Sequence, residues 1–279
     1  MCSSVRSRAV VSVSRRAKYG LRAIALIYVF VLVVIPMGVI TTRTLRQGLG
    51  AFWDAISSPQ AVSAFRLTAT VTVWAVVLNT IFGVGVAILL TRYRFPGKRL
   101  MSALIDIPIA ISPIVVGLAL VLVYGPYNGW FGKSLHSAGF EVIYAVPGMV
   151  LATVFVSLPL VLREVAPVLE EEGLDQEQAA RVLGASAWQR FRRITIPTIK
   201  WALSYGIVLS IARSIGEFGA IKVVSGDISG TGQTQTATLL VDERIEQLEP
   251  GAYQVSMVLI AVAVLAIILV SLIRPKEHS

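Results

Sequence analysis

The sequence is poor in the residues that catalytic and metal sites require. It contains one cysteine, Cys2, and two histidines, His136 and His278. A single cysteine forms no intrachain disulfide, and two isolated histidines do not make a zinc-ligand cluster. The G-x-x-x-x-G-K-[ST], H-E-x-x-H and G-x-S-x-G motifs are also absent. We therefore expect no catalytic residue, no metal and no bound nucleotide in this chain.

Charge is scarce as well: Asp, Glu, Lys and Arg make up 15% of the residues, whereas soluble domains have about one quarter. Hydrophobic residues make up 55%, and the mean hydropathy is +0.74. Apolar runs of about 18 or more residues recur, which is the length that crosses a bilayer. We predict an all-α membrane protein with six transmembrane helices, over residues 23–40, 67–90, 104–124, 142–162, 198–221 and 252–273.

The chain begins with a basic stretch, residues 1–22, which we interpret as a cytoplasmic leader. The apolar run that follows is longer than the roughly 7–15 residues of a signal-peptide core, and no A-x-A site follows it. We therefore expect it to be retained as the first span. In the connector 41–66, apolar and aromatic residues at helical spacing precede Ser58-Pro59, a cap followed by a first-turn proline. This pattern predicts a short helix at the membrane interface.

A polar, basic segment, residues 175–197, separates the fourth and fifth apolar runs and contains two helix-start signals. Asp175 is followed three residues later by Gln178, and Ser186 is followed by Gln189 in the same way. Each pair has the spacing of an N-cap and its return partner. We predict a helix–turn–helix here and refer to residues 175–197 as the knuckle.

Gly184 lies between the two short helices of the knuckle, where a residue that tolerates positive φ is needed. Pro197 comes at the entry to the next apolar run, where a missing N–H has no cost. On these grounds alone, a solvated loop that merely joins two spans is an equally good interpretation.

Basic residues are unevenly distributed among the loops. If both termini are cytoplasmic, the loops on that side hold 18 of the 25 Lys and Arg, six of them around the knuckle. This asymmetry agrees with the positive-inside rule and places the knuckle in the cytoplasm. The net charge of +9 then faces an anionic membrane leaflet, so we expect contact with lipid and no binding of nucleic acid.

A few ionisable residues interrupt the apolar runs, where each costs about 3 kcal/mol or more. Arg213 and Glu217 are four residues apart in the fifth run and could neutralise each other, or Arg213 could line a path for an anion. Asp106 is expected to be a local cap or a helix-to-helix contact, with a role as a ligand as the alternative. Arg163 and Glu164, at the end of the fourth run, fit a snorkelling pair.

The third run is expected to be broken by Pro108 and Pro113, with Ser112 satisfying a freed backbone group. Broken spans of this kind line cavities, although prolines are also common in ordinary membrane helices. A Gly/Ser/Thr-rich stretch, residues 226–236, offers backbone N–H groups, but we expect an external loop that contacts a partner protein.

The knuckle resembles the "EAA" loop of bacterial ABC-importer permeases, E-A-A-x3-G-x9-I-x-L-P. The resemblance implies a coupling helix that inserts into a groove of a cytoplasmic ATPase. Two positions depart from the pattern: the lead Glu is Gln178, and the Leu is Ile196. The matching positions, which the resemblance assigns to coupling, are Gln178, Ala179, Ala180, Gly184, Ile194 and Pro197.

Two further stretches, D-I-P-I-A-I-S-P-I-V-V-G-L from Asp106 and R-S-I-G-E-F-G-A from Arg213, resemble the sulfate/thiosulfate permeases of this family, closest to the W-type subunit. The resemblance implies a type I ABC importer permease (MetI-like) fold. It also implies a translocation path with Arg213 and Glu217 facing Asp106 and Ser112.

We predict a leader (1–22), a first helix with its connector (23–58), a permease domain (59–273), which the resemblance implies, and a cytoplasmic tail (274–279). The implied partners are a second, T-type permease, two ATPase subunits that bind ATP and Mg²⁺, and an extracytoplasmic sulfate-binding protein. The implied location is the bacterial inner membrane.

Two alternatives remain open from the sequence. A molybdate, tungstate or phosphate permease would carry the same coupling loop. An ATP-independent anion channel or carrier would need no cytoplasmic partner.

Overall fold

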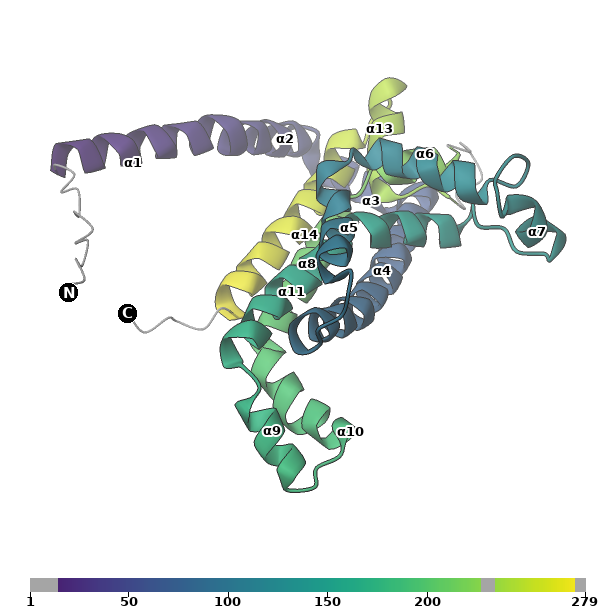
Figure 1. Cartoon of the computed structure of the whole chain (residues 1–279). Coiled ribbons are helices and arrows are strands. Elements are labelled where there is room, and N and C mark those ends of the chain that lie inside the picture. Colours follow the sequence, from purple (N-terminus) through teal and green to yellow (C-terminus); the bar gives the residue numbers. More distant parts are fainter. Residues whose placement is uncertain (1–14, 227–233, 274–279) are drawn as a thin grey trace.

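The computed structural model describes residues 15–226 and 234–273, with side chains from 19 to 269. Within these residues every regular element is helical (Figure 1). Five helices are long and apolar enough to cross a membrane, and a bent pair supplies a sixth span. The prediction of an all-α protein with six transmembrane helices is confirmed.

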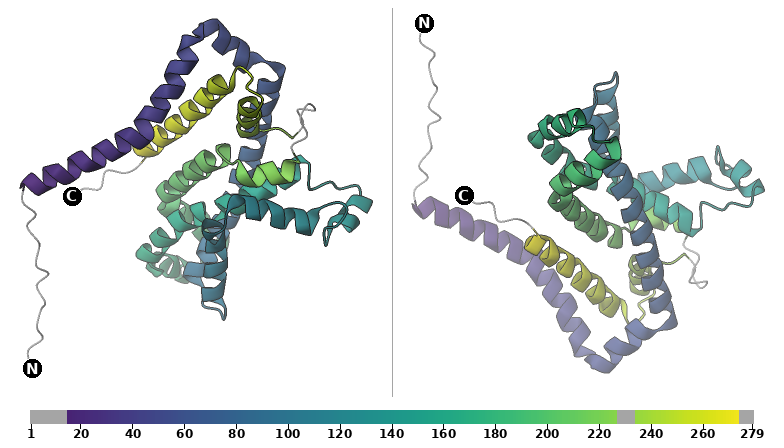
Figure 2. Two further views of the ribbon diagram at one scale, coloured as in Figure 1. Left: turned by 90° about the horizontal axis from the view of Figure 1, so that it is seen from above. Right: turned by 90° about the horizontal axis from the view of Figure 1, so that it is seen from below.

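The first span is one continuous helix that projects from the rest of the molecule (Figures 1 and 2). It consists of α1 (Arg15–Val29), a π-helical turn η1 (Phe30–Val34) and α2 (Ile35–Arg46). Its apolar window, within Tyr19–Arg46, is not buried by the rest of the chain. So large an apolar surface requires lipid or another subunit to cover it.

The predicted connector helix is α3 (Gly48–Ser57), followed by the long α4 (Pro59–Arg92). Ser58 is the N-cap of α4, and its Oγ accepts a hydrogen bond from the N–H of Ala61 at 3.3 Å. Pro59 takes the first helical position, where its missing N–H has no cost. The cap and proline read from the sequence are confirmed.

The core of the bundle is formed by α4, α8 (Val146–Glu172) and α11 (Ile196–Ile215). Two glycines let the helices approach closely at Val161 of α8. A Cβ built on Gly83 would lie 2.9 Å from Val161 Cβ, and one on Gly206 would lie 3.0 Å from Val161 Cα. One turn earlier on both α4 and α8, Asn79 Nδ2 donates to Ser157 Oγ at 2.7 Å. Small residues and interhelical hydrogen bonds are how membrane helices associate.

The third span is divided into α5 (Lys98–Ala110) and α6 (Pro113–Tyr124), which are bent by 113°. Ile111 and Ser112 between them are extended, as expected for residues that approach a proline. Pro113 therefore causes the break. Pro108, which was also expected to interrupt the span, lies inside α5.

The fifth span differs most from its prediction. One helix runs from Ala187 to Ile215 through α10 (Ala187–Arg190), the π turn η2 (Phe191–Thr195) and α11. It stops well before residue 221, and the chain restarts as α12 (Gly219–Ser225). Pro197 is therefore inside a continuous helix and not at its start. The π turn widens the helix just before this proline, whose ring would otherwise clash with a carbonyl of the preceding turn.

The remaining elements complete the chain. The segment between the third and fourth spans, residues 125–145, includes a short helix α7 (Gly132–Ser137). The fourth span starts at Val146 and continues to Glu172, beyond the predicted end. A further helix, α13 (Ala237–Glu246), precedes the sixth span, which is α14 (Ala252–Ile273), as predicted.

Candidate translocation path and coupling segment

The knuckle folds as two short helices joined by a left-handed turn. Two backbone hydrogen bonds close the end of α9 (Asp175–Val182). The N–H of Gly184 donates to the carbonyl of Arg181 at 3.0 Å, and the N–H of Ala185 donates to the carbonyl of Ala180 at 2.9 Å. These two bonds are the Schellman pattern, which requires positive φ at its central residue. Gly184 has φ +85°, so its predicted role in the turn is confirmed.

The start of the second knuckle helix is also as predicted. Ser186 Oγ accepts from the N–H of Gln189 at 3.2 Å, and Gln189 Oε1 accepts from the N–H of Ser186 at 2.8 Å. The first predicted cap is wrong: Leu174 is the N-cap of α9, and Asp175 is its first helical residue. At this first position the negative charge of Asp175 still stabilises α9, because it lies at the positive end of the helix dipole.

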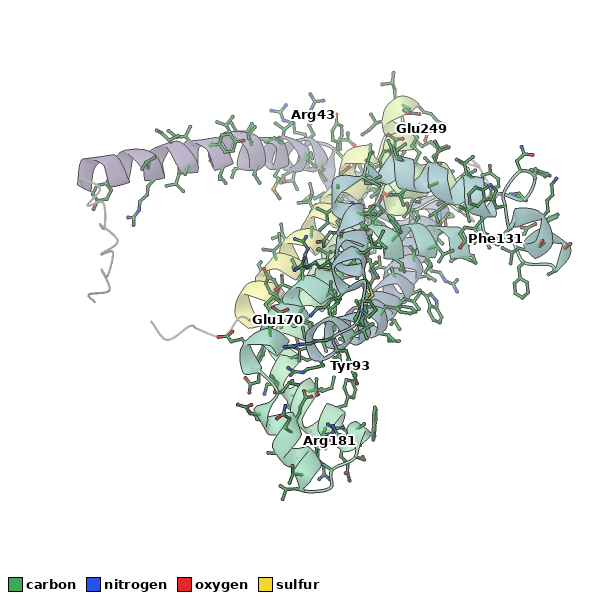
Figure 3. All side chains as sticks on the ribbon, viewed as in Figure 1. Arg43, Tyr93, Phe131, Glu170, Arg181 and Glu249 are labelled. Atoms are coloured by element: carbon green, nitrogen blue, oxygen red, sulfur yellow. The ribbon has the colours of Figure 1, made fainter. Side chains whose placement is uncertain are left out.

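The knuckle extends beyond the bundle, with Arg181 at the opposite end of the molecule from Arg43 and Glu249 (Figure 3). Val182 and Leu183 at its tip are 88% and 87% exposed. A hollow of about 490 Å³ lies between its helices. Of the six predicted coupling residues, Ala180, Gly184 and Ile194 line this hollow, whereas Gln178, Ala179 and Pro197 are exposed outside it.

An ion pair that the sequence analysis missed connects the knuckle to the membrane helices. Arg92 Nη2, at the end of α4, lies 3.0 Å from Glu177 Oε1. Arg92 Nη1 donates to the carbonyl of Leu169 on α8 at 2.9 Å, and Thr195 Oγ1 donates to Glu177 Oε1 at 3.3 Å. Both charged side chains are largely buried, at 9% and 17% exposure. Glu177 therefore faces inward and connects α9 to α4 and to the helix of the fifth span, and through Arg92 to α8.

We expect Glu177→Gln to loosen the knuckle without unfolding the bundle. Gln keeps the shape of the side chain but leaves the nearly buried Arg92 without its counter-charge. Amide hydrogen exchange in residues 175–195 should become at least about tenfold faster, which corresponds to about 1.4 kcal/mol of local stability. Glu172→Gln is the matched control, because the hydrogen bond that Glu172 accepts from Gln176 is exposed to solvent. Equal exchange in both variants would contradict the role of the Arg92–Glu177 pair.

A second site lies where the third span is broken. A cavity of about 240 Å³ is lined there by three prolines, Pro108, Pro113 and Pro159, and by Arg213 from the last turn of α11. The volume greatly exceeds the roughly 10–15 Å³ that one water requires. Prolines leave backbone carbonyls unpaired in membrane helices, and such breaks are tolerated where they line a cavity.

Arg213 is held in this cavity by Glu217. Arg213 Nη1 lies 2.7 Å from Glu217 Oε2, and the two side chains are 38% and 1% exposed. Glu217 follows the break in the fifth span, so the pair does not share one continuous helix as predicted. Glu217 Oε1 also accepts from the N–H of Ala220 at 3.0 Å, at the start of α12. The carboxylate therefore both neutralises Arg213 and caps α12.

The other two predicted path residues are placed differently. Asp106 pairs with Arg163 and not with Arg213, with Oδ1 at 2.9 Å from Arg163 Nη2 and 3.2 Å from Nε. The helix-to-helix interpretation of Asp106 is the one that the structure shows. Ser112 is the exposed N-cap residue of α6, beside the cavity, and makes no side-chain capping bond. Arg163 is not at a helix end, because α8 continues to Glu172.

At the other end of the molecule from the knuckle, Lys222 of α12 pairs with two acidic residues of α13. Its Nζ is 2.5 Å from Asp242 Oδ2 and 3.5 Å from Glu246 Oε1. The hydrogen bond to Asp242 raises the pKa of Lys222 above its usual value. These contacts fix α12 against α13. Most of the loop expected to meet a partner protein, residues 227–233, lies outside the described residues.

A six-span helical bundle with a cavity at a broken helix, lined by one arginine, and a protruding knuckle defines a multi-pass membrane transport subunit. The family model "Binding-protein-dependent transport system inner membrane component" matches residues 79–276, and the chain belongs to this family. It is a transport component and not an enzyme.

Individual relatives agree with this assignment. The "Sulfate transport system permease protein CysW" of Synechococcus elongatus is 44% identical over 258 residues, covering 92% of this chain and 89% of that protein. The "Sulfate transport system permease protein CysT" of Salmonella typhimurium is 34% identical over 253 residues, covering 90% of each. A chain of a bacterial ABC transporter involved in alginate import superposes with a TM-score of 0.74 at 16% identity, over 92% of this chain and 93% of that one. The predicted ABC-importer permease fold is confirmed.

Proposed function

We propose that this chain is one permease of an ATP-driven importer of sulfate and thiosulfate. The observation that carries the proposal is the Arg213 guanidinium, which is partly exposed in a cavity at the broken span and is held by the buried Glu217. A planar guanidinium donates two parallel hydrogen bonds and therefore suits a tetrahedral oxyanion. The names of the relatives, sulfate permeases of the CysW and CysT types, support the same substrate.

The same comparison supports the partners that we propose. We place a second, T-type permease beside this chain, two ATPase subunits that hold ATP and Mg²⁺ beneath it, and an extracytoplasmic sulfate-binding protein on the opposite side. The exposed apolar first span and the exposed apolar tip of the knuckle are surfaces that such subunits would cover. The description of the family as binding-protein-dependent supports an external receptor.

We place both termini in the cytoplasm of a bacterium, with the protein in the inner membrane. The basic loops support this orientation, as does α14, which ends on the side of the molecule where the knuckle lies (Figure 1). The knuckle then faces the cytoplasm, where an ATPase has access to it.

The structure offers a mechanical route from the ATPase to the cavity. The helix that starts at Ala187 in the knuckle continues to Ile215 and carries Arg213 in its last turn. At a rise of 1.5 Å per residue, this helix is about 40 Å long from Ala187 to Arg213. In the proposed mechanism, closure of the ATPases moves the knuckle, and the continuous helix transmits the motion to the cavity. The pathway then alternates between inward-open and outward-open states.

The test is reconstitution of the chain in proteoliposomes with the second permease, the ATPase and the binding protein. We expect uptake of labelled sulfate that requires ATP, is blocked by vanadate and is reduced by excess thiosulfate. Stronger competition by molybdate than by thiosulfate would assign a different oxyanion to the importer. Uptake through the two permeases without the ATPase would contradict the importer and favour a channel or carrier.

A further inference from the structure

The ion pair between Asp106 and Arg163 is unusual for its position. Both residues lie within helices of the membrane-spanning bundle, α5 and α8, yet their side chains are 41% and 54% exposed. Charges exposed to lipid near the bilayer centre cost about 3 kcal/mol or more each, so charged residues within spans normally face a protein interior or a water-filled path. The pair therefore marks a surface that is not covered by lipid in the working protein.

The pair continues the wall of the Arg213 cavity along α8. Val156 and Leu160 line the cavity. Arg163 follows them by seven and three residues, the spacing that keeps side chains on one face of a helix. Asp106 is likewise one turn before Ile109, which lines the cavity from α5. The distance from Leu160 to Arg163 along α8 is about 5 Å, toward the end of α8 that precedes the knuckle.

We propose that Arg163 is a second oxyanion-binding position on the translocation path, between the Arg213 cavity and the knuckle side of the membrane. This inference rests on the proposed function, because it assumes that the permeated ligand is an oxyanion. An anion leaving Arg213 meets Arg163 next, so the path has two arginines in series, each with its own carboxylate.

The geometry of the pair suits transient binding. Arg163 Nη2 and Nε both point to one oxygen of Asp106, Oδ1. An arriving oxyanion takes over these two N–H donors, and Asp106 Oδ1 takes them back when the anion leaves. A competing carboxylate weakens each position enough for the anion to move on, as conduction through several sites in series requires.

The first experiment uses the fact that the chain has only one cysteine, Cys2. In a Cys2→Ser background, Arg163→Cys should lower ATP-driven sulfate uptake at least tenfold. Reaction with a methanethiosulfonate that adds an ammonium group should restore uptake at least threefold, and a reagent that adds a sulfonate should not. Arg66→Cys is the matched control on α4, at an exposed position that forms no ion pair with the residues the structure describes, and should keep its uptake with either reagent.

A second variant separates function from folding. Arg163→Gln combined with Asp106→Asn removes both charges and leaves no unpaired ion, so assembly with the ATPase should be normal while uptake falls at least tenfold. If this double variant transports as well as Arg66→Gln, or if the ammonium reagent restores nothing, Arg163 is a structural partner of Asp106 and the inference is wrong. If the unmodified complex takes up no oxyanion at all, the proposed function fails instead.

Discussion

Replacing Gly184 with valine is expected to reduce ATP-driven uptake at least tenfold. Gly184 has φ +85°, a region that a β-branched residue enters only at a cost of about 1–3 kcal/mol. No heavy atom lies within 4 Å of a Cβ built there, so the substitution changes the backbone and not the packing. The strain is relieved by opening the Schellman turn, which changes the angle between α9 and α10 and thus the shape presented to the ATPase.

The effect is measured as labelled sulfate uptake in proteoliposomes, together with co-purification of the ATPase. Gly48→Val is the matched control, because Gly48 has φ +86° and equally open surroundings but is the first residue of α3, outside the knuckle. Gly184→Asn should keep most of the uptake, since asparagine tolerates the left-handed region. Anion binding by the separate receptor should be unchanged. Undiminished uptake in Gly184→Val would exclude a coupling role for the turn.

The second large effect is expected for Arg213→Gln, which should lower the rate of uptake at least tenfold. The substitution removes the guanidinium from the cavity and leaves Glu217, almost fully buried, without its cation. A buried carboxylate without a counter-charge destabilises the fold, so part of the loss in this variant is structural. Arg213→Lys should be intermediate, because lysine keeps the charge but not the planar fork.

The double variant Arg213→Gln, Glu217→Gln separates the two causes. It removes the buried charge while a glutamine at 217 can still accept from the N–H of Ala220. We expect membrane expression and ATPase assembly to recover but uptake to stay low. Lys200→Gln, an exposed cation on the same helix, is the control and should transport normally. Recovery of uptake in the double variant would mean that Arg213 serves only to neutralise Glu217.

Local signals account for the parts of the fold that the sequence analysis predicted well. Ser58-Pro59 starts α4, Gly184 turns the knuckle and Ser186 caps its second helix. Each of these features depends on a few neighbouring residues. One prediction from a local signal was wrong because the adjacent segment changes the conformation of the backbone. Pro197 was read as a helix start, but the π turn before it lets the helix continue.

The ion pairs required the tertiary structure. Asp106 and Arg163 are 57 residues apart, and Arg92 and Glu177 join α4 to the knuckle. A nearly uniform apolar helix carries little information about which side faces its neighbours, so partners across helices cannot be read from it. The Arg213–Glu217 pair was predicted from its spacing, but its location at a helix break was not.

The sequence by itself determined the membrane class, the number of spans, the broken third helix and the knuckle, because hydropathy, proline, glycine and caps act over short distances along the chain. Only the tertiary structure decided which charges pair, which residues line the cavity at Arg213, and that one helix joins the knuckle to it. These depend on how each helix is rotated and where it crosses its neighbours, which is set by close packing at positions such as Gly83, Val161 and Gly206.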